Sequence, residues 1–269
     1  MKNKLINNPD QHSVLSAQNL KIGYTAKKQH TQIGSSISFT ANTGELIAII
    51  GVNGAGKSTL LRTIGNVQKA LAGELHIRNK NISKHTPQEL ALEISLVLTE
   101  KIASKNLTVL ELIALGRQPY TNWIGSLSDK DTNAIQDAIT KVGLQDLKHK
   151  KCYELSDGQM QRVMIARALS QDTSIMLLDE PTTHLDLYHK ANILKLLKSI
   201  AYTTQKTILF TTHEIELAIQ LCDKMLLING KDNPFGQPCE LIEQKHFDSL
   251  FPQDTVMFDA STGTFRVKK

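Results

Sequence analysis

The sequence predicts an α/β fold, with a parallel sheet whose chain is interrupted by a helical insert. Two apolar runs, Ile175–Leu178 and Thr207–Phe210, have the length and composition of strands buried on both faces. Helix-compatible stretches follow them at Lys190–Ile200 and Glu214–Leu221, the strand–helix alternation of a parallel sheet. A third apolar run, Leu46–Ile50, leads directly into a glycine-rich loop, which adds a further strand–loop–helix unit.

A helical insert separates the early strands from the later ones. Residues 86–160 carry apolar positions at helical spacing, with Thr108 and Ser128 as expected N-caps. Shorter β-rich runs precede it at Val14–Ala17, Ile37–Thr40 and Leu75–Ile77. We therefore expect one domain over residues 13–230, with a helical subdomain of about 86–160 inserted in its core, and a short C-terminal appendix over residues 231–269.

Composition excludes several classes of protein and leaves others open. The 269 residues are 41% hydrophobic and 21% charged, which is ordinary for a folded protein. A net charge of +5 suits nucleic acid, anionic lipid or a phosphate ligand and does not choose among them. Cys152, Cys222 and Cys239 show no paired spacing, so we expect a reducing compartment and neither zinc nor disulfides. We see no secretory signal or membrane-length apolar run, so a role at a membrane would be exercised from the water side.

The glycine-rich loop has the pattern of a phosphate-binding site. It reads Gly-x-x-x-x-Gly-Lys-Ser/Thr, and its expected nucleotide contacts are Gly51, Asn53, Gly54, Ala55, Gly56, Lys57, Ser58 and Thr59. Backbone N–H groups of such a loop, together with the following helix N-terminus, attract phosphate oxygens. Lys57 is expected to reach the β- and γ-phosphates, and Ser58 to supply a hydroxyl to Mg²⁺. The sequence therefore predicts ATP and Mg²⁺ as cofactors, with Lys57 among the catalytic residues.

Two adjacent acids follow the buried strand Ile175–Leu178. Asp179 is expected at the carboxyl edge of the sheet, where it can help hold Mg²⁺. Glu180 is placed to polarise a water for attack on the γ-phosphate. His213 follows the run TILFTT and can hydrogen-bond the γ-phosphate from the same edge. Taken alone, the acids could be a solvated turn and the histidine a surface residue, but the neighbouring phosphate loop favours the catalytic interpretation.

A helix start within the insert carries the most specific pattern. Residues 155–162 read Leu-Ser-Asp-Gly-Gln-Met-Gln-Arg, with Ser156 a good N-cap and Asp157 suited to a first turn. This segment resembles the signature sequence of ABC ATPases, Leu-Ser-Gly-Gly-Gln, with Asp157 at the first glycine. It also lies 23 residues before Asp179, the separation typical of that family. The resemblance extends from Val14 to about Gly230 and implies a P-loop NTPase core of the ABC type.

The resemblance implies that two chains enclose two ATP molecules as a homodimer. Ser156, Gly158 and Gln159 would then contact the γ-phosphate of ATP held by the partner's phosphate loop. Asp186 matches the family's loop that crosses the dimer interface. Tyr24 matches the aromatic residue that stacks on adenine, although a tyrosine ending a strand is also ordinary. His184, Asp186 and His189 have the residue types of metal ligands, but the interface role accounts for Asp186 without a metal.

One position departs from the family pattern. After the expected strand Ser95–Leu98, the family usually has a glutamine that ligates Mg²⁺, and this chain has Glu100. A carboxylate oxygen is still a hard ligand for Mg²⁺, so we expect Glu100 to join Ser58 and Asp179 as metal ligands. A solvated loop carboxylate is the alternative.

The resemblance also narrows the biological role. Within transporters, the absence of a membrane-length apolar run favours a bacterial importer subunit. The stretch from Glu111 to Tyr120, ELIALGRQPY, is similar to one in ATPases of iron-siderophore, haem and cobalamin importers, and it also has the pattern of an amphipathic helix ending at Gly116 before Pro119. We therefore expect a bacterial importer ATPase on the cytoplasmic side of the inner membrane, bound peripherally to permease subunits in a complex with a substrate-binding protein. ATP-driven dimer closure would power transport. No nucleic-acid partner is expected; the alternative is a soluble, non-transport ABC ATPase acting on nucleic acid or in complex assembly.

Overall fold

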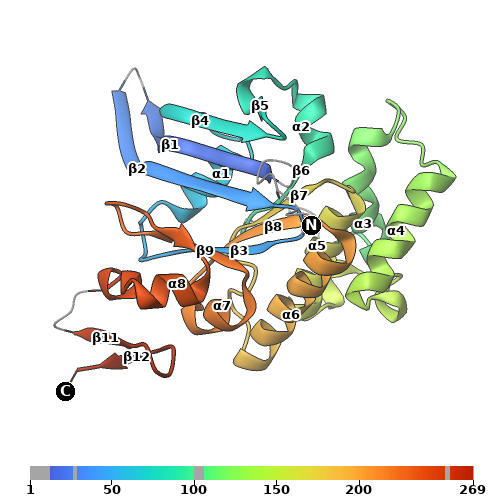
Figure 1. Cartoon of the computed structure of the whole chain (residues 1–269). Coiled ribbons are helices and arrows are strands. Elements are labelled where there is room, and N and C mark those ends of the chain that lie inside the picture. Colours follow the sequence, from blue (N-terminus) through green and yellow to red (C-terminus); the bar gives the residue numbers. More distant parts are fainter. Residues whose placement is uncertain (1–12, 27–28, 100–105, 252–254, 269) are drawn as a thin grey trace, which may run out of the picture.

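The computed structural model describes residues 13–26, 29–99, 106–251 and 255–268. At its centre lies a six-stranded sheet in the order β10-β9-β3-β8-β7-β6 (Figure 1). Its strands are β3 (Leu46–Gly51), β6 (Ile94–Val97), β7 (Ile175–Leu178), β8 (Thr207–Thr212), β9 (Lys224–Ile228) and β10 (Phe235–Gly236). All neighbours pair in parallel except β10, which is antiparallel to β9. The predicted α/β fold with a parallel sheet is therefore confirmed.

A second, antiparallel sheet packs on one face of the first. Its strands, in the order β2-β1-β4-β5, are β1 (Ser13–Ala26), β2 (Gln29–Asn42), β4 (Ala72–Ile77) and β5 (Lys80–Asn81). Because side chains alternate along a strand, β3 faces two cores. Ile47 and Ile49 contact the core beneath the antiparallel sheet, while Leu46, Ala48 and Ile50 contact the core beneath the helices. Burial on both faces explains why β3 is apolar throughout.

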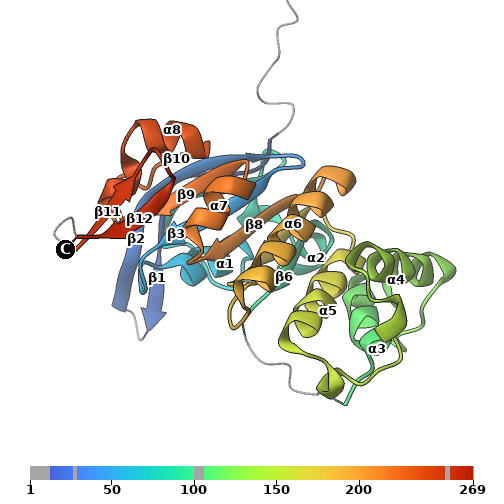
Figure 2. The same cartoon turned by 90° about the horizontal axis from the view of Figure 1, so that it is seen from below.

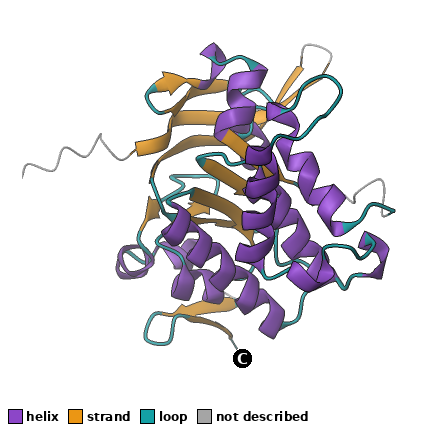
Figure 3. Ribbon diagram, turned by 90° about the vertical axis from the view of Figure 1, so that its right-hand side faces the viewer, coloured by secondary structure: helices purple, strands orange, loops and turns teal. Residues whose placement is uncertain are grey.

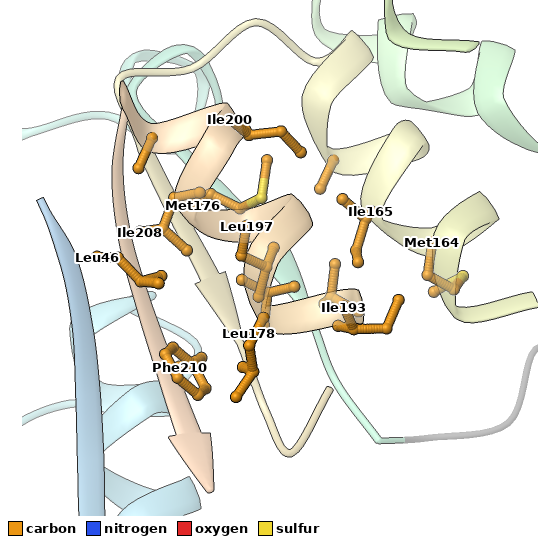
Figure 4. Close-up of a cluster of buried hydrophobic side chains, with 14 of the residues drawn as sticks. Leu46, Met164, Ile165, Met176, Leu178, Ile193, Leu197, Ile200, Ile208 and Phe210 are labelled. Atoms are coloured by element: carbon orange, nitrogen blue, oxygen red, sulfur yellow. The ribbon is translucent and has the colours of Figure 1, made fainter. Parts of the chain in front are cut away.

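Most helices cover the other face and extend beyond it. The helices are α1 (Lys57–Ile64), α2 (Pro87–Glu93), α3 (Val109–Ala114), α4 (Asp129–Val142), α5 (Asp157–Ser170), α6 (Leu187–Thr204), α7 (Ile215–Leu221) and α8 (Pro238–Glu243), with a 3₁₀ helix, η3 (Leu115–Tyr120), after α3. By contrast, α1 and α2 contribute Leu60, Leu61, Ile64 and Leu90 to the core beneath the antiparallel sheet. Figure 3 shows most of them gathered on one side of the strands. In Figure 4, Ile193, Leu197 and Ile200 of α6 lie between strand residues such as Phe210 and Ile165 of α5. These contacts fix α5 and α6 relative to the sheet edge.

Helices α3, α4 and α5 form a lobe at one end of the molecule (Figure 2). Each begins with a capping box, in which Thr108, Ser128 and Ser156 accept a bond from the backbone three residues later. The expected N-caps are thereby confirmed. Strand β6 lies within the range 86–160 but pairs with β7 in the central sheet. The division into a core, an inserted subdomain and an appendix stays a prediction.

The C-terminal residues add a small hairpin at the opposite end (Figure 2). Strands β11 (Val256–Asp259) and β12 (Thr264–Val267) pair antiparallel, and Phe258 stacks on Phe247 with ring centroids 4.8 Å apart. The backbone N–H of Phe265 donates to Glu216 of α7 at 3.2 Å. Among the described residues, no helix is both long and apolar enough to cross a membrane.

Candidate nucleotide site

The phosphate loop leaves β3 and enters α1 at the carboxyl edge of the central sheet. Gly51 is so closely packed that an added Cβ would lie 2.6 Å from the carbonyl oxygen of Ile228. Gly56 is the N-cap of α1 with φ +98°, a conformation that favours glycine, and a Cβ there would meet Ile33 at 2.7 Å. The loop therefore presents its backbone and the N-terminus of α1, an anion-attracting arrangement.

Lys57 is buried and folded back over this loop. Its Nζ donates to the carbonyl oxygen of Gly51 at 2.9 Å and to that of Val52 at 3.2 Å. Burial lowers the pKa of Lys57, and the nearby carboxylates of Glu180 and Asp179 partly oppose that shift. The ammonium is therefore held inside the loop, where phosphate oxygens can replace the two carbonyl contacts.

Asp179 joins the phosphate loop to the neighbouring strand. Its Oδ1 accepts hydrogen bonds from the Ser58 hydroxyl at 2.9 Å and from the Thr211 hydroxyl at 2.7 Å. The side chain is buried, and its backbone N–H donates to the carbonyl oxygen of Val97 on β6 at 2.8 Å. Three strands of the sheet thus fix the position of this carboxylate. The sequence alone does not indicate a role for Thr211, whose only signal is its place two residues before His213.

Glu180 lies one residue beyond the buried strand and has both carboxylate oxygens engaged. Oε1 is 2.9 Å from His213 Nε2, and Oε2 accepts a hydrogen bond from Thr183 Oγ1 at 3.0 Å. Its backbone adopts φ +48°, which is uncommon for a residue with a side chain, and its N–H donates to Thr211 Oγ1 at 2.8 Å. The strained turn and these contacts aim the carboxylate at His213.

These groups surround one open cavity of about 230 Å³. Its lining includes Asn53, Gly54, Gly56, Lys57, Ser58 and Thr59 from the loop, together with Tyr24, Ile33, Glu180 and His213. Tyr24 is half-exposed, and its hydroxyl lies 2.8 Å from Thr59 Oγ1.

Two predicted loop residues do not line the cavity: Ala55 packs inward on the core, and Gly51 forms the buried start of the loop. Sequence reasoning did not anticipate Ile33, because an isolated isoleucine on a strand carries no signal of ligand contact.

The expected magnesium ligands can be compared with the donors present. The Ser58 hydroxyl and the Asp179 carboxylate are hard oxygen donors already within 2.9 Å of each other. Among the described residues, no group of three or more His, Cys, Asp or Glu side chains could hold a metal ion. Two protein oxygens fit Mg²⁺, which keeps waters and phosphate oxygens as its other ligands. Glu100 lies outside the described residues.

The signature residues lie elsewhere. Ser156, Gly158 and Gln159 at the start of α5, and Asp186 at the start of α6, do not line the cavity formed by the phosphate loop. They are close to one another instead, because a Cβ on Gly158 would lie 3.3 Å from His189. Ser156 accepts a bond from the Gln159 backbone at 3.3 Å, as its predicted N-cap role requires. The chain thus carries two separate groups of predicted site residues.

Comparisons with known proteins agree with this geometry. The family model for ABC transporters matches residues 35–183. The petrobactin import ATP-binding protein FpuD of Bacillus anthracis is 36% identical over 77% of each chain. The iron(3+)-hydroxamate import ATP-binding protein FhuC of Bacillus subtilis is 35% identical over 80% of this chain and 78% of its own.

Solved structures share the fold. A metal-chelate type ABC transporter in an inward-facing conformation gives a TM-score of 0.76 at 27% identity, over 89% of both chains. A dimeric bacterial ABC transporter cassette gives 0.67 at 28% identity, over 79% of this chain and 93% of that one.

A parallel sheet with a phosphate loop, a strand-ending Asp-Glu pair and a cavity between them defines a P-loop nucleotide-binding protein. The chain belongs to the ABC transporter family. It is an ATP-binding ATPase cassette, and the family resemblance of its sequence is confirmed.

Proposed function

We propose that this ATPase powers import of a metal chelate, in the class of iron-siderophore, haem or cobalamin transporters. The observation that carries the proposal is the similarity to FpuD and FhuC, which extends over more than three quarters of the chain at 35–36% identity. The structural similarity to a metal-chelate type transporter supports the same class. The ATPase would work at the cytoplasmic side of the membrane, bound to permease subunits that receive cargo from a substrate-binding protein.

The site geometry supports a distinct role for each of several side chains in ATP hydrolysis. Lys57 would neutralise charge on the β- and γ-phosphates, since its ammonium already lies inside the loop. Tyr24 at the cavity rim would stack on adenine. Glu180 would accept a proton from the attacking water, and His213, 2.9 Å from Glu180 Oε1, would orient that carboxylate and contact the γ-phosphate.

Mg²⁺ would be held by Ser58 and Asp179, with Glu100 as the proposed further ligand. When bound, the ion screens charge between phosphate oxygens during phosphoryl transfer. The buried Asp179 is fixed by Thr211 as well as by Ser58, so its oxygen needs no rearrangement of the strand to serve as a ligand.

The second group of site residues supports a homodimer. Ser156, Gly158, Gln159 and Asp186 lie together at two helix starts, away from the cavity of their own chain. They would close over ATP bound to the partner, because a helix N-terminus presents unpaired N–H groups to an anion. A structurally similar cassette is dimeric, which supports this arrangement.

Uptake by living cells tests the proposed cargo class. In the host organism, the gene would be deleted and complemented with the wild-type protein or with Glu180→Gln, and uptake of radiolabelled ferric siderophore, haem and cobalamin measured. We expect deletion to abolish uptake of one of the three, the wild type to restore it and Glu180→Gln not to. Amino-acid uptake serves as the control.

Co-purification from membranes tests the proposal independently of uptake, because a second importer for the same cargo would hide the effect of the deletion. A tagged wild-type chain extracted in mild detergent should bring down a multi-span permease. Recovery in the supernatant without a permease, combined with unchanged uptake of all three cargoes, would contradict the proposal and favour the non-transport alternative.

A further inference from the structure

The first turn of α6 lies between the residues around the phosphate-loop cavity and the signature residues at the start of α5, and it makes contacts toward both. Its N-cap is Asp186, whose Oδ1 accepts a hydrogen bond from the His189 backbone N–H at 2.8 Å. The same oxygen lies 2.8 Å from Nδ1 of the His189 ring. The first contact is an ordinary helix cap, and the second is an additional one that keeps the carboxylate folded onto the helix. The bonds from His189 hold the pKa of Asp186 below its ordinary value.

The imidazole of His189 also contacts the signature segment. A Cβ on Gly158 would lie 3.3 Å from His189 Cδ2 and 3.8 Å from Leu185, so the ring packs directly against the glycine backbone. His189 is therefore in contact with both segments proposed to face the partner chain. The side chains of His189 and Asp186 are both at least half-exposed, so the contact between His189 Nδ1 and Asp186 Oδ1 adds little to the stability of the single chain.

The next residue, Lys190, contacts the segment that carries His213. Lys190 Nζ donates to Glu214 Oε1 at 2.6 Å, and Glu214 is the N-cap residue of α7. Glu214 directly follows His213, whose ring lies 2.9 Å from Glu180. Figure 2 shows α6 lying between α5 and α7, which is what allows one helical turn to contact both.

We propose that the first turn of α6 is a positioning element for ATP hydrolysis. His189 holds Asp186 and Gly158 in position to contact the nucleotide bound by the partner chain. Lys190, through Glu214, holds His213 in position beside Glu180. The inference rests on the proposed dimer and extends it, because it links the partner-facing surface of a chain to the catalytic pair of the same chain. Neither His189 nor Lys190 lines the nucleotide cavity, so both act through other residues.

The test separates the two side chains by matched variants. His189→Asn keeps a donor near the position of Nδ1, whereas His189→Leu removes it. Lys190→Gln breaks the ion pair with Glu214, and the double exchange Lys190→Glu/Glu214→Lys re-forms it with reversed charges. Lys195→Gln is the control, since Lys195 is an exposed lysine of α6 with no hydrogen bond or ion pair among the described residues.

Each variant is assayed for kcat and KM of ATP hydrolysis, and for ATP-dependent dimerisation in a Glu180→Gln background. Lys190→Gln should lower kcat about fivefold at unchanged KM, well short of the hundredfold that about 1 Å of misplacement can cost. The double exchange should restore much of that loss. His189→Leu should raise the ATP concentration needed for dimerisation about fivefold, the effect of one hydrogen bond, and His189→Asn should not.

The outcomes distinguish this inference from the proposed function. If Lys190→Gln and His189→Leu match Lys195→Gln in kcat, KM and dimerisation while the wild type is active, the positioning role is wrong and the ATPase assignment stands. If Lys190→Gln loses activity but the double exchange recovers none of it, the ion pair is not the cause and the role of Lys190 is overturned. A Glu180→Gln chain that never dimerises with Mg-ATP would remove the basis for both the positioning role and the proposed homodimer. Circular dichroism and thermal unfolding of every variant identify losses caused by misfolding.

Discussion

The buried ion pair between Arg117 and Asp131 holds η3 and α4 to the C-terminal end of α5, and its removal should strongly lower the stability of the fold. Arg117 Nε and Nη2 both lie 2.8 Å from Asp131 Oδ1, and Nη1 donates to the carbonyl oxygen of Ser170 at 2.7 Å. The guanidinium also stacks on Tyr120, 3.8 Å from the ring centroid. Both charged side chains are almost wholly buried.

Arg117→Met keeps most of the side-chain volume but leaves the Asp131 carboxylate without its counter-ion. Removing one partner of a buried pair typically costs about 3 to 5 kcal/mol. Asp131 Oδ2 retains two donors from Ser128, its backbone N–H at 2.9 Å and its hydroxyl at 2.6 Å. We therefore expect a loss near the lower end, about 3 kcal/mol. Arg117→Met/Asp131→Asn removes the stranded charge as well and should recover about 1 to 2 kcal/mol of that loss.

Urea unfolding followed by circular dichroism measures this effect directly. The hydrogen bonds from Ser128, followed by Arg117, hold the pKa of Asp131 at about 2, below its ordinary 3.8. A carboxylate with a lowered folded pKa stabilises the fold fully above its unfolded pKa and loses that contribution as the pH falls. The wild-type advantage over Arg117→Met should thus be full above about pH 4 and shrink toward pH 2. Coincident unfolding curves at pH 7 would refute the reasoning.

Two further predictions concern the phosphate loop and the proposed metal ligand. Lys57→Ala should abolish ATP binding or hydrolysis, because it removes the ammonium enclosed by the loop; turnover like that of the wild type in a coupled ATPase assay would exclude the site. Glu100→Gln should keep activity, since an amide oxygen can occupy the same Mg²⁺ position, whereas Glu100→Ala should lower hydrolysis and leave Mg²⁺-independent nucleotide binding intact. An unchanged rate and Mg²⁺ dependence in Glu100→Ala would mean that Glu100 is not a ligand.

Strong local patterns made much of the fold predictable. Strand β7 has the bounds that its four apolar residues indicated, because a strand buried on both faces leaves no polar ambiguity. The N-caps at Thr108 and Ser128 were equally predictable. A hydroxyl three residues before an acid forms a capping box, which satisfies backbone N–H groups at the helix N-terminus through local contacts alone. Strand β1 was predicted only over Val14–Ala17, yet it runs to Ala26 through irregular pairing near Asn19, whose φ is +47°. Its polar exposed residues hide the alternation on which the prediction depends.

The parts of the site that come from tertiary packing could not be predicted in the same way. Lys57, Asp179 and Glu180 were found because their motifs are contiguous in sequence. The hydroxyl of Thr211, which fixes Asp179, comes from a different strand, and only the parallel register brings it within 2.7 Å. In the sequence, Arg117 belongs to an amphipathic stretch. Its burial cannot be predicted from that stretch, because its partner Asp131 lies on another helix. Such pairings depend on helix packing, which spacing along the chain does not encode.

The most direct test of the proposed mechanism is size-exclusion chromatography of Glu180→Gln with and without Mg-ATP, together with its rate of ATP turnover. The substitution preserves shape and hydrogen bonding toward His213 and Thr183 but removes the base, so ATP should bind and remain unhydrolysed. We predict a dimer that forms only with Mg-ATP and disappears when Lys57→Ala is added to the same chain. A variant that turns over ATP at the wild-type rate, or stays monomeric with ATP bound, would contradict the account of Glu180 as the base in a two-chain nucleotide site.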